Sequence, residues 1–238
     1  MLINMSNVST NSYYSEDGDR VTMAYTVKEI CGREVRFREC ASDSCIVTFF
    51  ADFDEKELSG LMESLPGVSI MAVKVNDWNQ ELSPWKADPV FGDEGFGDGA
   101  EDTLSFIEDK VIPEIGCDRL VIGGYSLAGL FSLWACYRSD AFEGCCASSP
   151  SVWFPKWDEF IGENRFLASK AYLSLGEKES RTRNQVMFTV ADRIRMQFDS
   201  LSEQIGPDNV TLEWNKGGHF QDVNDRKARS FQWMLERI

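Results

Sequence analysis

The sequence predicts an α/β fold, with a mostly parallel central sheet and helices on both of its faces. Short apolar stretches rich in β-branched residues alternate along the chain with amphipathic helical patterns. The 238 residues, 43% of them hydrophobic, suffice for the core of one such domain. This alternation favours parallel strands joined by crossover helices.

The elements follow one another in a regular order. Residues 1–20 are polar, and we expect a loosely ordered segment ahead of a single domain over 21–238. A β-hairpin is predicted over 20–40, and the apolar run CIVTFFA over 45–51 is typical of a buried central strand. Further strands are predicted over 68–75, 118–125, 144–150, 170–176 and 209–215, and helices over 54–65, 100–115, 127–138, 156–161, within 184–205, and over 225–238.

The charge balance limits the partners. The formal net charge is −15 at pH 7, so repulsion disfavours nucleic acid and anionic membrane surfaces. We find no apolar run long enough to span a membrane and no secretory signal pattern at the N-terminus, and therefore expect a cytoplasmic protein. The sequence leaves the oligomeric state open.

No metal or other cofactor is expected. The seven cysteines include no C-x-x-C pair, and His219 is the only histidine, which leaves a poor ligand set for a transition metal. In a cytoplasm the thiols would stay reduced.

Ligands of parallel sheets bind at the carboxyl ends of strands, so the loops that follow the predicted strands are informative. Three of these loops carry reactive groups: Ser126 after the strand over 118–125, GEKES over 176–180, and KGGHF over 216–220. Ser126 lies in GYSLA at a strand-to-helix turn, which would expose its hydroxyl as a nucleophile. The pattern alone is weak, because Gly123 and Gly124 would also suit an ordinary tight turn.

The other two loops supply a base and an acid. His219 is the only imidazole general base in the chain, although a lone histidine usually has no role. Glu177 and Glu179 are candidates for the carboxylate that orients it, and Asp222 is a weaker one. The chain order serine, acid, histidine is that of α/β-hydrolases. Backbone N–H groups of Leu127 and of Phe53, in the loop after 45–51, are candidates for an oxyanion hole.

Several segments resemble the enterochelin esterase and esterase D-like family of α/β-hydrolases, from about residue 45 onward. They are DWNQELSPW, GFGDGAEDTLSFIEDKVIPEI, GGYSLAGLFSLWA, SSPSVWF and GGHFQD. The resemblance implies an esterase with the α/β-hydrolase fold, and its G-x-x-[D/E] pattern favours Glu179 as the acid. The chain itself shows no large insertion between GCCASSP and KAYLSL, so we expect little or no lid. Two departures are Ala128, where the family has glycine, and a glutamate where many members carry aspartate.

Four tryptophans fall in loops expected to rim the site. Trp78, Trp85 and Trp153 are candidate walls for a sugar or an aromatic acyl group, and packing is the alternative for each. For Trp153 and for Trp157, packing is favoured.

We therefore expect a serine carboxylesterase with Ser126 as nucleophile, His219 as base and Glu179 as acid, acting on a small or soluble ester. A thioesterase or acyltransferase with the same three residues, or a ligand-binding protein without turnover, is the alternative.

Overall fold

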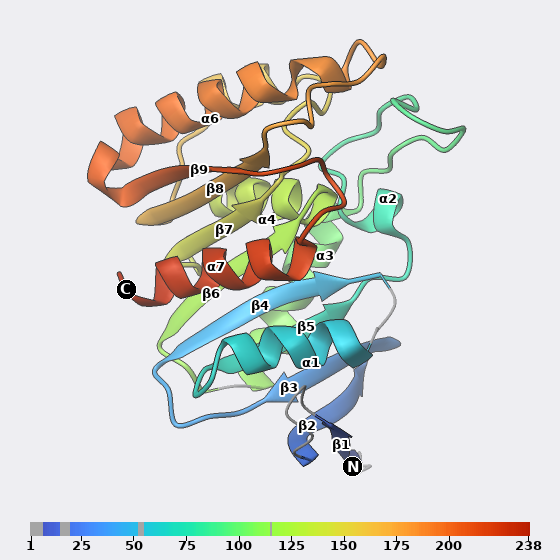
Figure 1. Cartoon of the computed structure of the whole chain (residues 1–238), viewed down its shortest axis with the longest axis vertical. Coiled ribbons are helices and arrows are strands. Elements are labelled where there is room, and N and C mark those ends of the chain that lie inside the picture. Colours follow the sequence, from blue (N-terminus) through green and yellow to red (C-terminus); the bar gives the residue numbers. More distant parts are fainter. Residues whose placement is uncertain (1–6, 15–19, 52–54, 115) are drawn as a thin grey trace.

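Nine strands form one sheet in the computed structural model, which describes residues 7–14, 20–51, 55–114 and 116–238. Their order across the sheet is β1-β2-β3-β5-β4-β6-β7-β8-β9 (Figure 1). The strands are β1 Asn7–Tyr14, β2 Arg20–Ile30, β3 Arg33–Arg38, β4 Ser44–Phe50, β5 Ser69–Lys74, β6 Arg119–Tyr125, β7 Gly144–Ser148, β8 Lys170–Gly176 and β9 Val210–Asn215.

The sheet is parallel from β5 to β9 and antiparallel from β1 to β5. Helices cover both faces, so the predicted fold class is confirmed. They are α1 Glu55–Ser64, α2 Trp78–Glu81, α3 Ala100–Phe106, α4 Leu127–Arg138, α5 Trp157–Glu163, α6 Val190–Ile205 and α7 Val223–Leu235. None of the helices in the described ranges is long and apolar enough to cross a membrane.

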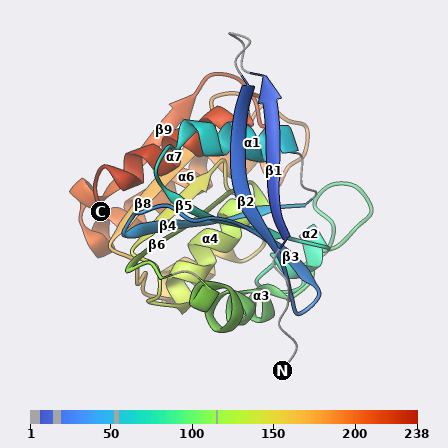
Figure 2. The ribbon, with the colours of Figure 1, turned by 90° about the horizontal axis from the view of Figure 1, so that it is seen from below.

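Each face of the sheet has its own core. Side chains of α1 and α7 pack on one face around Ile46, Ile70 and Phe231. Side chains of α3, α4, α5 and α6 pack on the other face, around Val47 and Ile122. Figure 2 shows α1 and α7 on the side of the sheet opposite to α3 and α4. Both faces are therefore buried, as the continuous apolar strands require.

The expectation of a loosely ordered segment over 1–20 is wrong for Asn7–Tyr14. These residues form β1, which pairs antiparallel with β2 from Asn7 opposite Val27 to Tyr14 opposite Arg20. The stretch includes β-branched and aromatic residues, which favour strands. Pairing with β2 supplies backbone hydrogen bonds whatever the polarity of the side chains, so a polar composition alone does not predict this strand.

The helix predicted over 100–115 is less regular than expected. It begins as α3, continues as a π turn over Ile107–Val111 and ends as a 3₁₀ turn over Ile112–Glu114. Pro113 has no N–H and would clash with a carbonyl one turn earlier in a regular α-helix. The altered turns accommodate this proline and keep Ile107 and Val111 buried.

Candidate active site

Ser126 lies at the bend between β6 and α4, with φ 59° and ψ −120°. A non-glycine residue rarely adopts positive φ, and such strain persists only where the surroundings hold it. The Ser126 N–H donates to the Ser148 carbonyl at 3.1 Å, and the Ser126 carbonyl accepts from the N–H groups of Leu130 at 3.0 Å and Ser151 at 3.1 Å. Neighbouring β7 and the start of α4 thus hold the bend and its side chain in place.

Ala128 fits into this bend because Gly124 has no side chain. A Cβ atom at Gly124 would lie 2.6 Å from the Ala128 Cβ, closer than real Cβ contacts. At Gly123 a Cβ would lie 2.6 Å from the Phe231 ring. The methyl group of Ala128 is fully buried in the space that Gly124 leaves open. The departure from glycine at position 128 is therefore compatible with the bend.

The structure brings Ser126, His219 and Glu179 together at the carboxyl ends of β6, β9 and β8. The His219 Nε2 atom lies 3.0 Å from Ser126 Oγ, and its Nδ1 atom lies 2.7 Å from Glu179 Oε2. The Glu179 side chain is 5% exposed and that of His219 is 23% exposed. With Glu179 ionised, Nδ1 carries the proton and Nε2 is free to accept the Ser126 hydroxyl proton. The segment Lys216–Phe220, which carries His219, is called the histidine loop below.

Glu179 is fixed by three donors on its other oxygen. Its Oε1 atom accepts from the Gly176 N–H at 2.8 Å, the Ser149 hydroxyl at 2.8 Å and the Arg226 Nη1 at 3.3 Å. Of the two competing carboxylates, Glu177 is exposed, and Asp222 precedes α7 in the left-handed region at φ 54°. Glu179 is thus the carboxylate that meets His219.

Some residues around the site escaped the sequence analysis. Ser151 Oγ lies 3.4 Å from Ser126 Oγ, and the Tyr125 hydroxyl donates to the His219 carbonyl at 2.6 Å. Burial raises the pKa of Tyr125, so its hydroxyl remains a donor at neutral pH. Ser149 and Ser151 directly follow β7, a position from which the sequence could have indicated a role in the site. Arg226 lies within a helical pattern, which gives no such indication.

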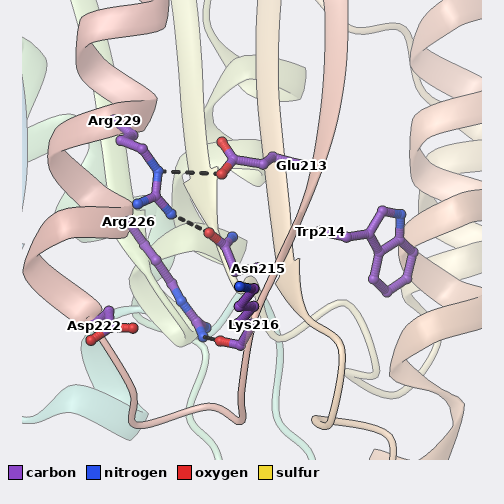
Figure 3. A pocket seen from close by; sticks show the side chains of 7 residues that line it. All are labelled: Glu213, Trp214, Asn215, Lys216, Asp222, Arg226 and Arg229. Atoms are coloured by element: carbon purple, nitrogen blue, oxygen red, sulfur yellow. Dashed lines mark hydrogen bonds and ion pairs between the residues drawn. The ribbon is translucent and has the colours of Figure 1, made fainter.

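A pocket of about 410 Å³ lies between β9 and α7, next to the histidine loop. Figure 3 shows Arg226 and Arg229 reaching into it from α7 and Glu213 and Asn215 from β9. Trp214, Lys216 and Asp222 complete its lining. The lining includes neither Ser126 nor His219, so this β9–α7 pocket does not hold the reacting atoms.

The tryptophans proposed to line the substrate site are engaged in packing. Trp153 is 7% exposed and stands against Phe91, Phe96 and Phe154. Trp85 is partly buried against the core and donates from Nε1 to the Pro155 carbonyl at 2.9 Å.

Trp78 begins the short helix α2 and is partly buried against the core, and Trp157 is fully buried. Packing was favoured for Trp157, and it donates from Nε1 to Gln197 Oε1 at 2.8 Å. Substrate contacts of Trp78, Trp85 and Trp153 stay predictions, and Trp153 has little surface left for one.

The structure describes only one of the two oxyanion candidates. Leu127 is the first residue of α4, where a backbone N–H has no acceptor within the helix. Phe53 lies outside the described residues.

Phe220, which the sequence did not single out, lies next to His219. Its ring is 91% exposed and stands edge-on to the imidazole, with ring centroids 5.1 Å apart.

The parallel sheet and the serine at a strained strand-to-helix bend define the α/β-hydrolase fold, and solved structures agree. Siderophore hydrolase EstA from Aspergillus nidulans superposes with a TM-score of 0.66 at 16% identity, covering 98% of this chain and 95% of that one. An IroE-like serine hydrolase from Shewanella oneidensis gives 0.67 at 15% identity, covering 97% and 80%. The enterobactin esterase Fes from Shigella flexneri gives 0.61 at 14% identity, covering 95% and 60%.

Sequence similarity is more local. No family model matches the chain. The siderophore enterobactin esterase of Emericella nidulans is 33% identical over 76 residues, which are 32% of this chain. The match spans only a quarter of that relative's length, 25%. These names agree with the family that the motifs resemble.

Proposed function

We propose that this chain is a serine carboxylesterase that cleaves small or soluble esters. The observation that carries the proposal is the continuous hydrogen-bonded series from the Ser126 hydroxyl through His219 to the buried Glu179. A strained serine joined to an imidazole, itself joined to a carboxylate, is the arrangement that activates a hydroxyl for acyl transfer. The names of the relatives support ester hydrolysis.

In this mechanism Ser126 Oγ attacks the ester carbonyl while His219 Nε2 takes the hydroxyl proton. The tetrahedral oxyanion accepts a hydrogen bond from the Leu127 N–H at the start of α4. His219 then gives its proton to the leaving alcohol as the C–O bond breaks, which produces an acyl-enzyme on Ser126. Water, deprotonated by His219, then attacks the acyl carbon, and His219 returns that proton to Ser126 Oγ as the bond to the serine breaks and the acid leaves. Glu179 stays ionised and stabilises the imidazolium in both halves.

One feature supports a small or soluble substrate, and a second supports an aromatic acyl group. Only the seven-residue α5 forms a helix between β7 and β8, and it packs on the domain through Trp157 and Ile161, so it offers no apolar cover for a long acyl chain. The exposed Phe220 ring beside His219 offers an apolar contact to an aromatic acyl group. Aromatic acyl esters, acylated sugars and the siderophore esters named for the relatives are the substrates that we propose to test.

The test is hydrolysis of p-nitrophenyl acetate, butyrate and palmitate, a feruloylated sugar and enterobactin by wild type and Ser126→Ala. Ser200→Ala, on α6 and away from the strand ends, is the matched control. We expect short or aromatic esters to be cleaved faster than palmitate, with loss of activity only in Ser126→Ala. Undiminished hydrolysis by Ser126→Ala would refute the mechanism, and preferred transfer to added alcohols or faster cleavage of thioesters would reassign the reaction.

A further inference from the structure

Arg226 is a buried charge on the side of the site away from Ser126. It lies in the first turn of α7, and its side chain is 0% exposed. Burying a charge is costly unless it is paired and hydrogen-bonded. Its ion-pair partner is Glu179, the residue proposed as the acid of the site, with 3.3 Å between Nη1 and Oε1. The fold therefore keeps an arginine in its interior next to the carboxylate that contacts His219.

The same guanidinium holds the backbone of the histidine loop. Its Nη2 atom donates to the carbonyls of Lys216 at 2.9 Å and Gly218 at 3.1 Å. Its Nη1 atom donates to the Tyr125 hydroxyl at 3.0 Å, and this hydroxyl in turn donates to the His219 carbonyl. The remaining carbonyl, that of Gly217, accepts from the Lys178 N–H at 3.0 Å. Every carbonyl from 216 to 219 thus has a donor, and Arg226 holds three of the four directly or through Tyr125, with the Gln221 N–H as a second donor to Gly218 at 3.4 Å.

These contacts join the ends of four strands that are far apart in sequence. Nη1 lies within hydrogen-bonding distance of Glu179 after β8, Ser149 after β7 and Tyr125 at the end of β6, while Nη2 holds the loop after β9. A lysine ammonium has no planar fork and cannot reproduce this set of directions. Only the fixed geometry of a guanidinium serves both the acid and the histidine loop.

We propose that Arg226 is a positioning residue of the active site. It sets the place of the His219 imidazole relative to Ser126 by holding the histidine loop and Glu179 in one rigid unit, and it does not touch the substrate. This inference rests on the proposed function and extends it to a residue for which the sequence offers no motif. Misplacement of a catalytic group by about 1 Å can cost roughly 100-fold in rate.

The β9–α7 pocket makes the proposal testable by chemical rescue. Arg226 lines this pocket, so shortening its side chain would open a space that joins the pocket and admits a small cation (Figure 3). Arg229 is one turn along the same helix, half exposed, and pairs with Glu213 at 3.2 Å and with Asn215. It touches neither Glu179 nor the histidine loop through any bond in the described residues, so Arg229→Ala is a matched control.

The experiment measures kcat and KM of wild type, Arg226→Ala, Arg226→Lys and Arg229→Ala on an ester that the wild type cleaves in a Ser126-dependent way. We expect kcat of Arg226→Ala to fall about 100-fold, with KM within about threefold, because binding is untouched while the base is misplaced. Millimolar methylguanidinium should restore kcat at least tenfold and methylammonium should not. Arg226→Lys should stay well below wild type, and Arg229→Ala should match it.

Three outcomes would overturn the inference. One is an Arg226→Ala enzyme with wild-type kcat. Another is a loss of kcat that methylguanidinium does not restore, which would indicate a merely structural role. If Arg226→Ala does not fold, Tyr125→Phe decides, because it removes the hydroxyl that connects Arg226 to the His219 carbonyl and keeps the bonds of Arg226 to Glu179 and Lys216. A lowered kcat with unchanged KM supports the inference, and a wild-type kcat overturns it. If wild-type hydrolysis persists in Ser126→Ala, the proposed function fails instead, and the two failures are distinct.

Discussion

Replacement of Glu179 by glutamine tests the geometry of the site in a way that the structure makes specific. The Oε1 position accepts from the Gly176 N–H, the Ser149 hydroxyl and the Arg226 guanidinium, of which the first and last can only donate. In Glu179→Gln the amide oxygen must therefore occupy this position. The amide NH₂ then faces His219 Nδ1 across the 2.7 Å contact that Oε2 makes in the wild type.

The consequence is that His219 adopts the other neutral tautomer. An NH₂ group facing Nδ1 forces that atom to accept, so the proton moves to Nε2, where it points at Ser126 Oγ. A histidine in this tautomer cannot take the serine proton. The corresponding aspartate-to-asparagine change in a serine protease lowers kcat by about 10⁴, which corresponds to roughly 5 kcal/mol in the barrier. We expect a loss of this order in Glu179→Gln, together with reduced stability, because Arg226 loses its buried counter-ion.

The assay has two parts. Ester hydrolysis at neutral pH, at a temperature where circular dichroism shows the variant folded, gives kcat. Because His219 is the only histidine of the chain, ¹⁵N-histidine labelling gives the signals of one imidazole. The wild type should show a protonated Nδ1, and Glu179→Gln should show a protonated Nε2.

Glu177→Gln is the matched control, since Glu177 is an exposed residue of the same loop. It should leave both the tautomer and kcat unchanged. A Glu179→Gln variant that retains more than a tenth of wild-type kcat, or that keeps the proton on Nδ1, would refute this reasoning.

Three further predictions concern the bend, the rim and the core. Ala128→Gly should lower the free energy of unfolding by about 1–2 kcal/mol and retain kcat. Gly124→Ala should lower both the stability and kcat, because its Cβ would lie 2.6 Å from that of Ala128. Denaturant unfolding and ester hydrolysis measure the two quantities, and equal stability of the two variants would contradict the prediction. Phe220→Ala should change stability by less than about 0.5 kcal/mol and raise KM for aromatic esters more than for acetate; equal changes in KM would exclude an aromatic contact. Burial raises the pKa of Tyr137 from 10.0 to about 12, so the folded state disfavours its ionised form and stability should fall by about 2 kcal/mol as pH rises from 10 to 12. Thermal unfolding against pH should show this fall, and Tyr137→Phe should show a smaller one.

Sequence patterns located the loops of the site because each follows a strand that is recognisable locally. The apolar runs before Ser126 and Glu179 mark buried parallel strands, and the pattern VTLEWN before His219 marks the half-buried edge strand β9. Parallel strands bring their carboxyl ends to one edge of the sheet. The choice between Glu177 and Glu179 depended on the family resemblance. Spacing alone could not decide it, because the turn after Gly176 determines which side chain points inward.

The contacts that support the site could not be predicted in the same way. Arg226 reaches Glu179 only because α7 docks over β7 and β8, and its position in the amphipathic pattern does not indicate where the helix packs. The same limit applies to the tryptophans. Packing was favoured for Trp153 and Trp157, and both are buried. For Trp85, residue type and loop position could not decide, because the aromatic cluster around it is assembled from distant parts of the chain.

The most direct test of a nucleophilic Ser126 is covalent trapping. Treatment of the protein with a fluorophosphonate, followed by digestion and mass spectrometry, should place one phosphonyl group on the peptide that contains Ser126. Labelling should disappear in Ser126→Ala and slow strongly in His219→Ala, since the imidazole removes the hydroxyl proton. Labelling of another serine, or labelling of Ser126→Ala at the wild-type rate, would contradict the assignment.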